Sequence, residues 1–167
     1  MEEMNPTGTV LIVDDEPTVC TALSRLLNPP WHALTAEDAE SALELLTKEP
    51  VDVIISDHHM PGMSGVDLLK LVRVRYPKIV RIMLTGEHDP EIPVRSINES
   101  EVYRFIRKPC NPQDLRTMVS FAFQIARLEQ EKKHLITLLR KQAASPSDPA
   151  DIEAEIIKLA EEEMGEG

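Results

Sequence analysis

The stretch Val53-Ile54-Ile55-Ser56-Asp57-His58-His59-Met60-Pro61-Gly62 decides how this chain folds. It begins as a short, β-branched apolar run and ends in turn residues, which is typical of a fully buried strand rather than one face of an amphipathic helix. A carboxylate at the end of such a strand can be held at the rim of a sheet without being buried inside it. Asp57 is therefore the candidate chemical centre of the protein.

Four more apolar runs resemble this one, and amphipathic segments separate them. The predicted strands cover residues 9–13, 31–35, 51–56, 79–84 and 102–106. Helical periodicity, N-cap residues and first-turn prolines predict helices over 17–27, 38–49 and 66–76, a short helix from Asp89, and a long helix from Asn111 to about Gln142. Alternating strands and helices predict an α/β, doubly wound fold with a five-stranded parallel sheet. Right-handed crossovers then place every strand's carboxyl end along one edge, where such sheets carry their sites.

Polar side chains follow four of the five predicted strands. They are Asp14 and Asp15 after the first, Asp57 after the third, Thr85 after the fourth and Lys108 after the fifth. Three carboxylates at one rim would raise one another's pKa unless a cation lies among them. Mg²⁺ suits carboxylates, waters and a phosphate oxygen, whereas no Cys/His set for Zn²⁺ is apparent. The pattern predicts phosphoryl transfer to Asp57, with Mg²⁺, Lys108 and the Thr85 hydroxyl neutralising the phosphoryl oxygens.

Four motifs together resemble the receiver domain of two-component response regulators. They are Val10-Leu11-Ile12-Val13-Asp14-Asp15-Glu16-Pro17, Ser56-Asp57 with Met60-Pro61-Gly62-Met63-Ser64-Gly65, Met83-Leu84-Thr85-Gly86, and Phe105-Ile106-Arg107-Lys108-Pro109. The resemblance covers residues 9–126 and implies a flavodoxin-like (βα)5 fold with strand order 2-1-3-4-5. It also implies that Asp57 accepts a phosphoryl group from a sensor histidine kinase or a phosphotransfer protein.

The same resemblance implies roles for the other rim residues. Asp14, Asp15, Asp57 and the backbone carbonyl of His59 would hold Mg²⁺, and Lys108 would bind the phosphoryl group.

A switch is implied as well, because a phosphoryl group adds about −1.5 to −2 charges at one point. Thr85 would swing towards the phosphate and Phe105 would follow inward as the switch aromatic. The alternative for Phe105 is an ordinary core residue. The Lys108–Pro109 peptide bond would be cis.

The loop after Asp57 departs from the family pattern, because His58 and His59 stand where an arginine-bearing loop is expected. Adjacent loop side chains are expected to point in different directions, so no metal pair is predicted. Solvated loop histidines are one interpretation. The other is kinetic tuning, in which His59 and Glu87 gate water and set the lifetime of the phosphoryl group.

The chain continues beyond the length that a receiver domain needs. A helical extension is predicted for residues 127–144, with leucines at a heptad-like spacing that Lys132 interrupts. This extension is either a solvated helix or a helix that dimerises and carries a signal. Residues 145–167 predict an acidic linker and a short helix, and residues 1–8 a flexible N-terminus. Eight acidic residues and one basic residue give 145–167 a formal charge of −7, out of −11 for the whole chain.

Composition narrows the functional classes. The negative charge argues against direct binding of nucleic acid or an anionic membrane. Two cysteines make no disulfide framework, and no signal peptide or membrane-spanning run is apparent, so a cytoplasmic protein is expected.

Four functional forms fit the sequence. The preferred one is the receiver part of a longer response regulator whose output is outside this chain. The Asp57 loop and the Tyr103–Pro109 stretch are similar to those of receivers joined to cyclic-dinucleotide phosphodiesterases. The others are a stand-alone regulator, a phosphorylation-independent scaffold, and an aspartyl-nucleophile phosphatase. The phosphatase is disfavoured because His59 occupies the place of its second acid. No enzyme activity beyond self-phosphorylation and self-dephosphorylation is expected.

Overall fold

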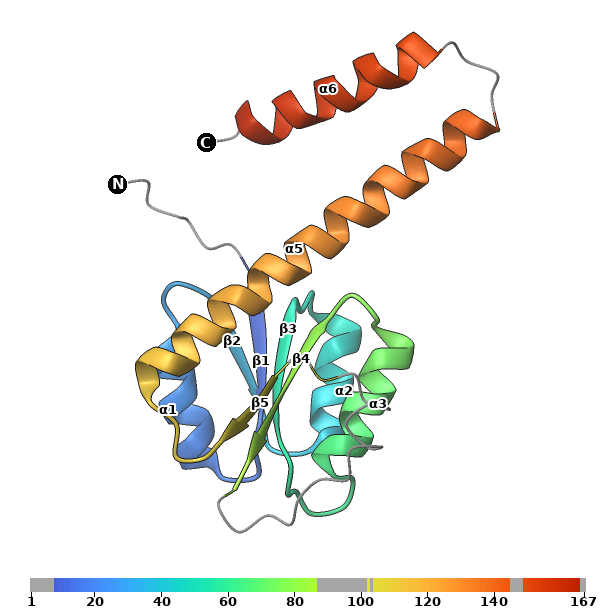
Figure 1. Ribbon diagram of the computed structural model, residues 1–167. Helices are drawn as coiled ribbons and strands as arrows, with labels where there is room; N and C mark the ends of the chain where they lie inside the picture. Colours follow the sequence, from blue (N-terminus) through green and yellow to red (C-terminus); the bar gives the residue numbers. More distant parts are fainter. Residues whose placement is uncertain (1–7, 87–101, 103, 145–148, 166–167) are drawn as a thin grey trace. The chain divides into compact units, whose positions relative to one another are not determined.

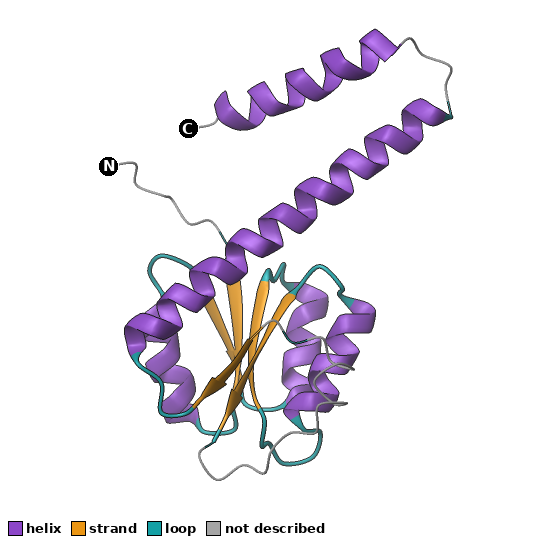
Figure 2. Cartoon of the chain, in the orientation of Figure 1, coloured by secondary structure: helices purple, strands orange, loops and turns teal. Residues whose placement is uncertain are grey.

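The computed structural model describes residues 8–86, 102, 104–144 and 149–165. It forms two compact units, Met1–Arg127 and Leu128–Gly167. The strands of the first unit are β1 (Thr9–Val13), β2 (His32–Ala36), β3 (Val53–Asp57), β4 (Val80–Thr85) and β5 (Arg104–Arg107). They form one parallel sheet in the order β2-β1-β3-β4-β5 (Figure 2), which confirms the predicted flavodoxin-like topology.

Helices cover both faces of this sheet. They are α1 (Pro17–Leu27), α2 (Ala39–Lys48), α3 (Gly65–Arg75) and α5 (Pro112–Ala143). Figure 1 shows α1 and the first part of α5 on one face and α2 and α3 on the other. The short helix predicted from Asp89 lies outside the described residues.

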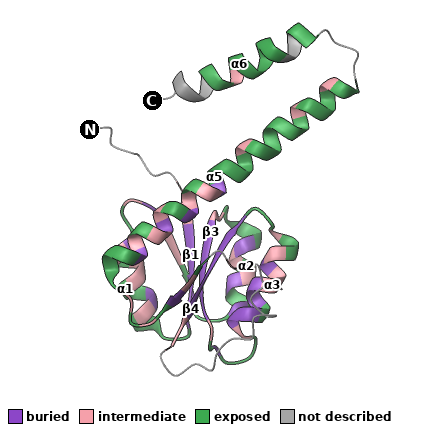
Figure 3. Ribbon diagram, viewed as in Figure 1, coloured by how far each residue is buried: buried purple, intermediate pink, exposed green. Residues whose placement is uncertain are grey.

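The alternation of side chains along each strand builds two cores. In β1, Val10 and Ile12 join the cluster under α1 and α5, while Leu11 and Val13 join the cluster under α2 and α3. All four residues are fully buried, and β1 is drawn in the colour of buried residues in Figure 3. Strands buried on both faces must be apolar at every position, which explains the continuous runs in the sequence.

Polar caps set where the helices begin. The Asp38 carboxylate accepts a hydrogen bond from the Ser41 backbone N–H at 2.7 Å, and the Asn111 side chain accepts one from the Gln113 N–H at 2.8 Å. Both N-caps match the sequence prediction. Trp31 differs, because its N–H donates to the Leu27 carbonyl and β2 begins one residue later.

Trp31 instead anchors the first part of α5. Its ring stacks on Phe123 with centroids 5.2 Å apart and 8° between the planes. The Arg116 guanidinium lies 5.8 Å from the Trp31 ring centroid and donates to the Leu26 carbonyl. This stack joins α5 to the turn between α1 and β2, in which the Asn28–Pro29 and Pro29–Pro30 bonds are cis.

The second unit contains the rest of α5 and α6 (Pro149–Gly165). The Gln142 side chain donates a hydrogen bond to Glu155 on α6 at 2.9 Å. Exposed apolar side chains are common here, among them Leu128, Leu135 and Leu139. No helix in the described part of the chain combines the length and apolar character of a membrane span.

Candidate functional site: an acidic pocket at the carboxyl edge of the sheet

The site begins with three strands whose ends are brought into register. Val13 pairs with Ser56 across β1 and β3, and Asp57 pairs with Leu84 across β3 and β4. Asp14 therefore leaves β1 beside Asp57, although 43 residues separate them in sequence. Parallel pairing alone accounts for this meeting.

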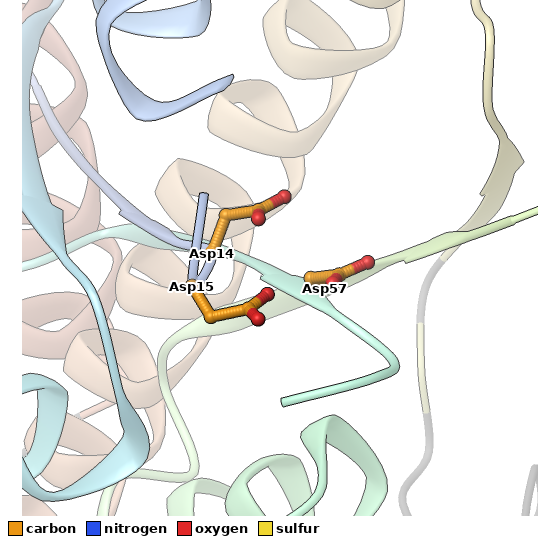
Figure 4. A group of neighbouring side chains, drawn as sticks. All are labelled: Asp14, Asp15 and Asp57. Atoms are coloured by element: carbon orange, nitrogen blue, oxygen red, sulfur yellow. The ribbon is translucent and has the colours of Figure 1, made fainter. Parts of the chain in front are cut away.

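Three carboxylates gather at this edge. Asp14, Asp15 and Asp57 offer oxygens that all lie within 4.8 Å of one another, and Figure 4 shows them projecting from two neighbouring strand ends. Asp14 is fully buried, Asp57 is 7% exposed, and Asp15 is exposed. The cluster thus has one deep, one nearly buried and one solvent-facing carboxylate.

Lys108 supplies a cation to this cluster from the end of the edge strand β5. Its Nζ lies 2.8 Å from Asp14 Oδ2 and 3.0 Å from Asp57 Oδ1. Its backbone N–H donates to the Thr85 carbonyl at 2.6 Å, so the end of β5 is tied to the end of β4. The Lys108–Pro109 bond is cis, as the resemblance implies.

These contacts shift the acid–base behaviour of the pair. Burial raises the pKa of Asp57; the Lys108 hydrogen bond lowers it in part, and the negative charges of Asp14 and Asp15 add to the rise. Burial would lower the pKa of Lys108, but its hydrogen bonds to Asp14 and Asp57 outweigh this and leave that pKa raised. Lys108 is therefore firmly protonated, and one ammonium faces three acids.

The donor set fits a hard divalent cation. The three acids offer carboxylate oxygens only, which is the ligand chemistry that Mg²⁺ prefers. One lysine cannot balance three carboxylates, so the cluster retains negative charge for a metal to neutralise. Asp14 is already engaged on both oxygens, since Oδ1 accepts the Glu16 N–H at 3.0 Å and Oδ2 accepts from Lys108.

A comparison with protein-family models identifies the family of this domain. The model described as the response regulator receiver domain matches residues 10–120, more than half of the chain. The chain belongs to this receiver family. Receiver domains take part in phospho-aspartate signalling with histidine kinases and generally bind Mg²⁺ at their acidic pocket.

Curated relatives agree with this assignment. The hydrogenase transcriptional regulatory protein HoxA of Cupriavidus necator is 41% identical over 133 residues, which cover 80% of this chain and 28% of HoxA. A cyclic di-GMP phosphodiesterase of Thermotoga maritima is 31% identical over 135 residues, covering 80% of this chain and 36% of that protein. The chain thus spans about a quarter to a third of the length of these relatives.

Solved structures of receivers are also similar. The receiver domain of an HD domain-containing protein from Pseudomonas fluorescens Pf-5 has a TM-score of 0.69 at 36% identity, covering 72% of this chain and 98% of that one. A receiver domain protein from Clostridium thermocellum has a TM-score of 0.67 at 30% identity, with coverage of 72% and 98%.

The structure places the remaining predicted residues of the receiver as follows. The Thr85 hydroxyl is half-buried and donates to the Ile106 carbonyl at 3.5 Å. Phe105 is half-buried and packs against the core under α2 and α3. His59 is exposed, and Glu87 lies outside the described residues.

The expectation that the two loop histidines diverge is wrong. The rings of His58 and His59 meet edge to face with centroids 4.7 Å apart. The chain turns sharply here, because the His58 N–H donates to the Leu84 carbonyl while its own carbonyl accepts from Gly65. That turn brings neighbouring side chains to the same side.

Sequence reasoning assigned no role at the site to two residues that contact its backbone, Gly65 and Cys20. A Cβ on Gly65 would clash with the Asp57 carbonyl oxygen, so only glycine lets α3 start this close to the acceptor. The thiol of Cys20, a residue of α1, donates a hydrogen bond to the Asp14 carbonyl at 3.4 Å. The motif Met-Ser-Gly at 63–65 was a usable signal for the first, whereas nothing in the sequence distinguishes Cys20 from an ordinary core residue.

Proposed function

We propose that Asp57 is the phosphoacceptor of this receiver. A carboxylate oxygen of Asp57 attacks the phosphorus of a phosphohistidine, and a new O–P bond forms as the N–P bond breaks. The imidazole nitrogen leaves with the electron pair and is protonated by solvent. The observation that supports this assignment is the Lys108 ammonium, held within 3.0 Å of both Asp14 and Asp57 at a solvent-accessible rim.

Each neighbouring group has a role in that reaction. Asp14, Asp15, Asp57 and the backbone carbonyl of His59 would hold Mg²⁺, which when bound offsets charge on the phosphoryl oxygens. Lys108 stays protonated and can pair with a phosphoryl oxygen in place of one carboxylate contact. These are positioning and electrostatic roles, because phosphoryl transfer asks little covalent help of the protein.

Thr85 and Phe105 form the switch. The Thr85 hydroxyl bond to Ile106 is at the outer limit for a hydrogen bond, so little is lost when the hydroxyl turns to the phosphoryl group. Phe105 is only half-buried, so its ring can gain burial by moving into the space that Thr85 leaves.

His59 and Glu87 set how long the phosphoryl group lasts. His59 is exposed, two residues past the acceptor, which suits a side chain that meets incoming water. Replacing His59 with alanine should change the rate of phosphoryl loss measured by intact mass over time. Equal half-lives for the two proteins would remove His59 from the mechanism.

The wider assignment follows from the same site. The physiological phosphoryl donor is a sensor histidine kinase or a phosphotransfer protein. The receiver domain spans residues 9–126, and the protein works in the cytoplasm. The chain catalyses only its own phosphorylation and dephosphorylation. The relatives' names point to different outputs, transcriptional regulation and cyclic di-GMP hydrolysis, so no output is assigned here. Dimerisation through the extension of α5 is part of the proposal.

The direct test is acetyl phosphate with Mg²⁺, followed by intact mass. We expect one added phosphoryl group on the natural chain and none on Asp57→Asn. Asp67→Asn is the matched control, because Asp67 is an exposed carboxylate at the start of α3 outside the acidic pocket. Labelling of Asp57→Asn at the natural rate would refute the assignment. If neither the natural chain nor the variants are labelled, a scaffold that works without phosphorylation would be favoured.

A further inference from the structure

Ser56 places a hydroxyl group inside the buried strand that leads to the acceptor. Strand β3 has the sequence Val-Ile-Ile-Ser-Asp and is buried at every position. Ser56 itself is fully buried. A hydroxyl group in such surroundings costs free energy unless it makes a hydrogen bond, and a small apolar residue would fill the same place without this cost. The partner of the Ser56 hydroxyl therefore indicates what the serine does.

That partner is the backbone of the acceptor residue. Ser56 Oγ donates a hydrogen bond to the Asp57 carbonyl at 3.0 Å. The N–H of the same peptide unit belongs to His58 and donates to the Leu84 carbonyl at 2.9 Å. Both polar ends of the Asp57–His58 peptide unit are therefore held, one by the preceding side chain and the other by β4.

The start of α3 packs against the same peptide unit. A Cβ on Gly65 would clash with the Asp57 carbonyl oxygen, and the Gly65 N–H donates to the His58 carbonyl at 3.0 Å. Ile54 joins the core under α2 and α3, and side chains alternate along a strand, so Ser56 lies on this face too. The hydroxyl and the helix thus approach the acceptor backbone from one face of the sheet.

The Asp57–His58 peptide unit lies between two parts of the candidate site. On one side is the Asp57 carboxylate, and on the other is the loop with the His59 carbonyl, a proposed Mg²⁺ ligand. Without the hydroxyl, the buried Asp57 carbonyl loses a donor, and the peptide unit can rotate towards another one. Such a rotation would displace the carboxylate and the loop together.

Small displacements of this kind have large effects on metal binding and on group transfer. Groups that orient metal ligands without touching the metal typically change affinity or activity by about 10- to 100-fold when they are replaced. A reacting group that moves by about 1 Å can lose about a hundredfold in rate.

We propose that Ser56 is a positioning residue for the acceptor. Its hydroxyl fixes the Asp57–His58 peptide unit and so keeps the Asp57 carboxylate and the following loop in place for Mg²⁺ and the phosphoryl donor. Ser56 acts through the backbone and does not touch the phosphoryl group, and the proposal rests on the proposed function of Asp57. The competing explanation is a core hydroxyl that contributes to stability alone.

Four single variants of the full chain separate the two explanations. Ser56→Ala and Ser56→Val remove the hydroxyl. Ser56→Thr keeps it at nearly the volume of valine, so the difference between Thr and Val reports on the hydroxyl rather than on size. Ile54→Val is the matched control, because it weakens packing on the same strand and the same face but leaves Ser56 intact.

Amide hydrogen exchange in EDTA tests the contact without metal or phosphoryl donor. Exchange of the His58 N–H should be about tenfold faster in Ser56→Ala and Ser56→Val, since one hydrogen bond to its peptide unit is lost. Exchange in Ser56→Thr and Ile54→Val should stay close to that of the natural chain. Unchanged exchange in Ser56→Ala would overturn the proposal, because the hydroxyl would then not hold the peptide unit.

Calorimetric titration with Mg²⁺ and acetyl-phosphate labelling test the consequence for the site. We expect Mg²⁺ affinity and the labelling rate at saturating acetyl phosphate each to fall about tenfold or more in Ser56→Ala and Ser56→Val. Ser56→Thr and Ile54→Val should stay within about twofold of the natural chain. Natural affinity and rate in Ser56→Ala, or an equal loss in Ile54→Val, would reduce Ser56 to a core residue and overturn the proposal.

The remaining outcomes also decide the matter. Ser56→Thr as impaired as Ser56→Val would mean that the hydroxyl is not the cause, and would overturn the proposal. If urea unfolding shows that Ser56→Thr does not fold, Ser56→Ala against Ile54→Val decides. A natural chain that takes up no label would refute the proposed function of Asp57, whereas amide exchange and Mg²⁺ affinity would still decide the role of Ser56.

Discussion

Removing the Lys108 charge while keeping the length of the side chain should destabilise the metal-free receiver strongly. In Lys108→Met, the buried carboxylates of Asp14 and Asp57 lose the cation 2.8 and 3.0 Å away. Breaking a buried ion pair by deleting one partner costs about 3–5 kcal/mol. The Lys108 side chain is 27% exposed, so solvent screens part of this and we expect a loss of about 2–3 kcal/mol.

Urea unfolding in EDTA measures this loss. With a slope of about 1–3 kcal/mol per molar urea, the midpoint should fall by roughly 1 M. The pKa of Lys108 is raised, so its contribution is fully present at neutral pH and fades only as the pH rises through that raised pKa. Burial raises the pKa of Asp57, so acid protonates this carboxylate early and the gap between natural and variant chains should narrow as pH falls.

Mg²⁺ and a surface control make the test specific. Mg²⁺ at about a hundredfold excess over its dissociation constant should raise the free energy of unfolding by roughly 2.7 kcal/mol for any form of the protein that binds it. Lys48→Met is the control, because Lys48 pairs with Glu44 at only 2.6 Å but both side chains are more than 60% exposed. We expect no measurable change there. A Lys108→Met protein as stable as the natural chain in EDTA would refute the electrostatic account of the pocket.

Three further outcomes follow from local contacts. Phe123→Ala should cost about 2–3 kcal/mol in urea unfolding and change the emission of Trp31, the one tryptophan of the chain, since their rings stack. Gly65→Ala should abolish acetyl-phosphate labelling or lower the melting temperature by several degrees, because its Cβ would clash with the Asp57 carbonyl; normal behaviour in both assays would contradict the packing. Hydrogen bonds from Ser41 lower the pKa of Asp38, so Asp38→Ala should melt at a lower temperature than the natural chain at neutral pH. This difference in melting temperature should close as the pH falls through the lowered pKa of Asp38. A difference that persists in strong acid would exclude the charged cap.

Much of the fold could be predicted because its signals are local. A strand buried on both faces needs an apolar residue at every position, and the runs at residues 10–13 and 53–55 meet that requirement. Helix starts at Asp38 and Asn111 were also predictable, since each cap bonds to a backbone N–H two or three residues away. The strand predicted from Trp31 begins at His32 instead, and the Trp31 ring packs against α5.

The candidate site was predictable in its members but not in its contacts. The sequence was enough to predict that Asp14, Asp57 and Lys108 reach one edge, because parallel strands linked by right-handed crossovers end on the same side. The folded structure was needed to show that Lys108 bridges Asp57 and Asp14, which lies 94 positions before it in the sequence, and that Gly65 lies against the acceptor backbone. Such contacts depend on side-chain reach and helix docking between elements far apart in the chain, to which no local sequence pattern is sensitive.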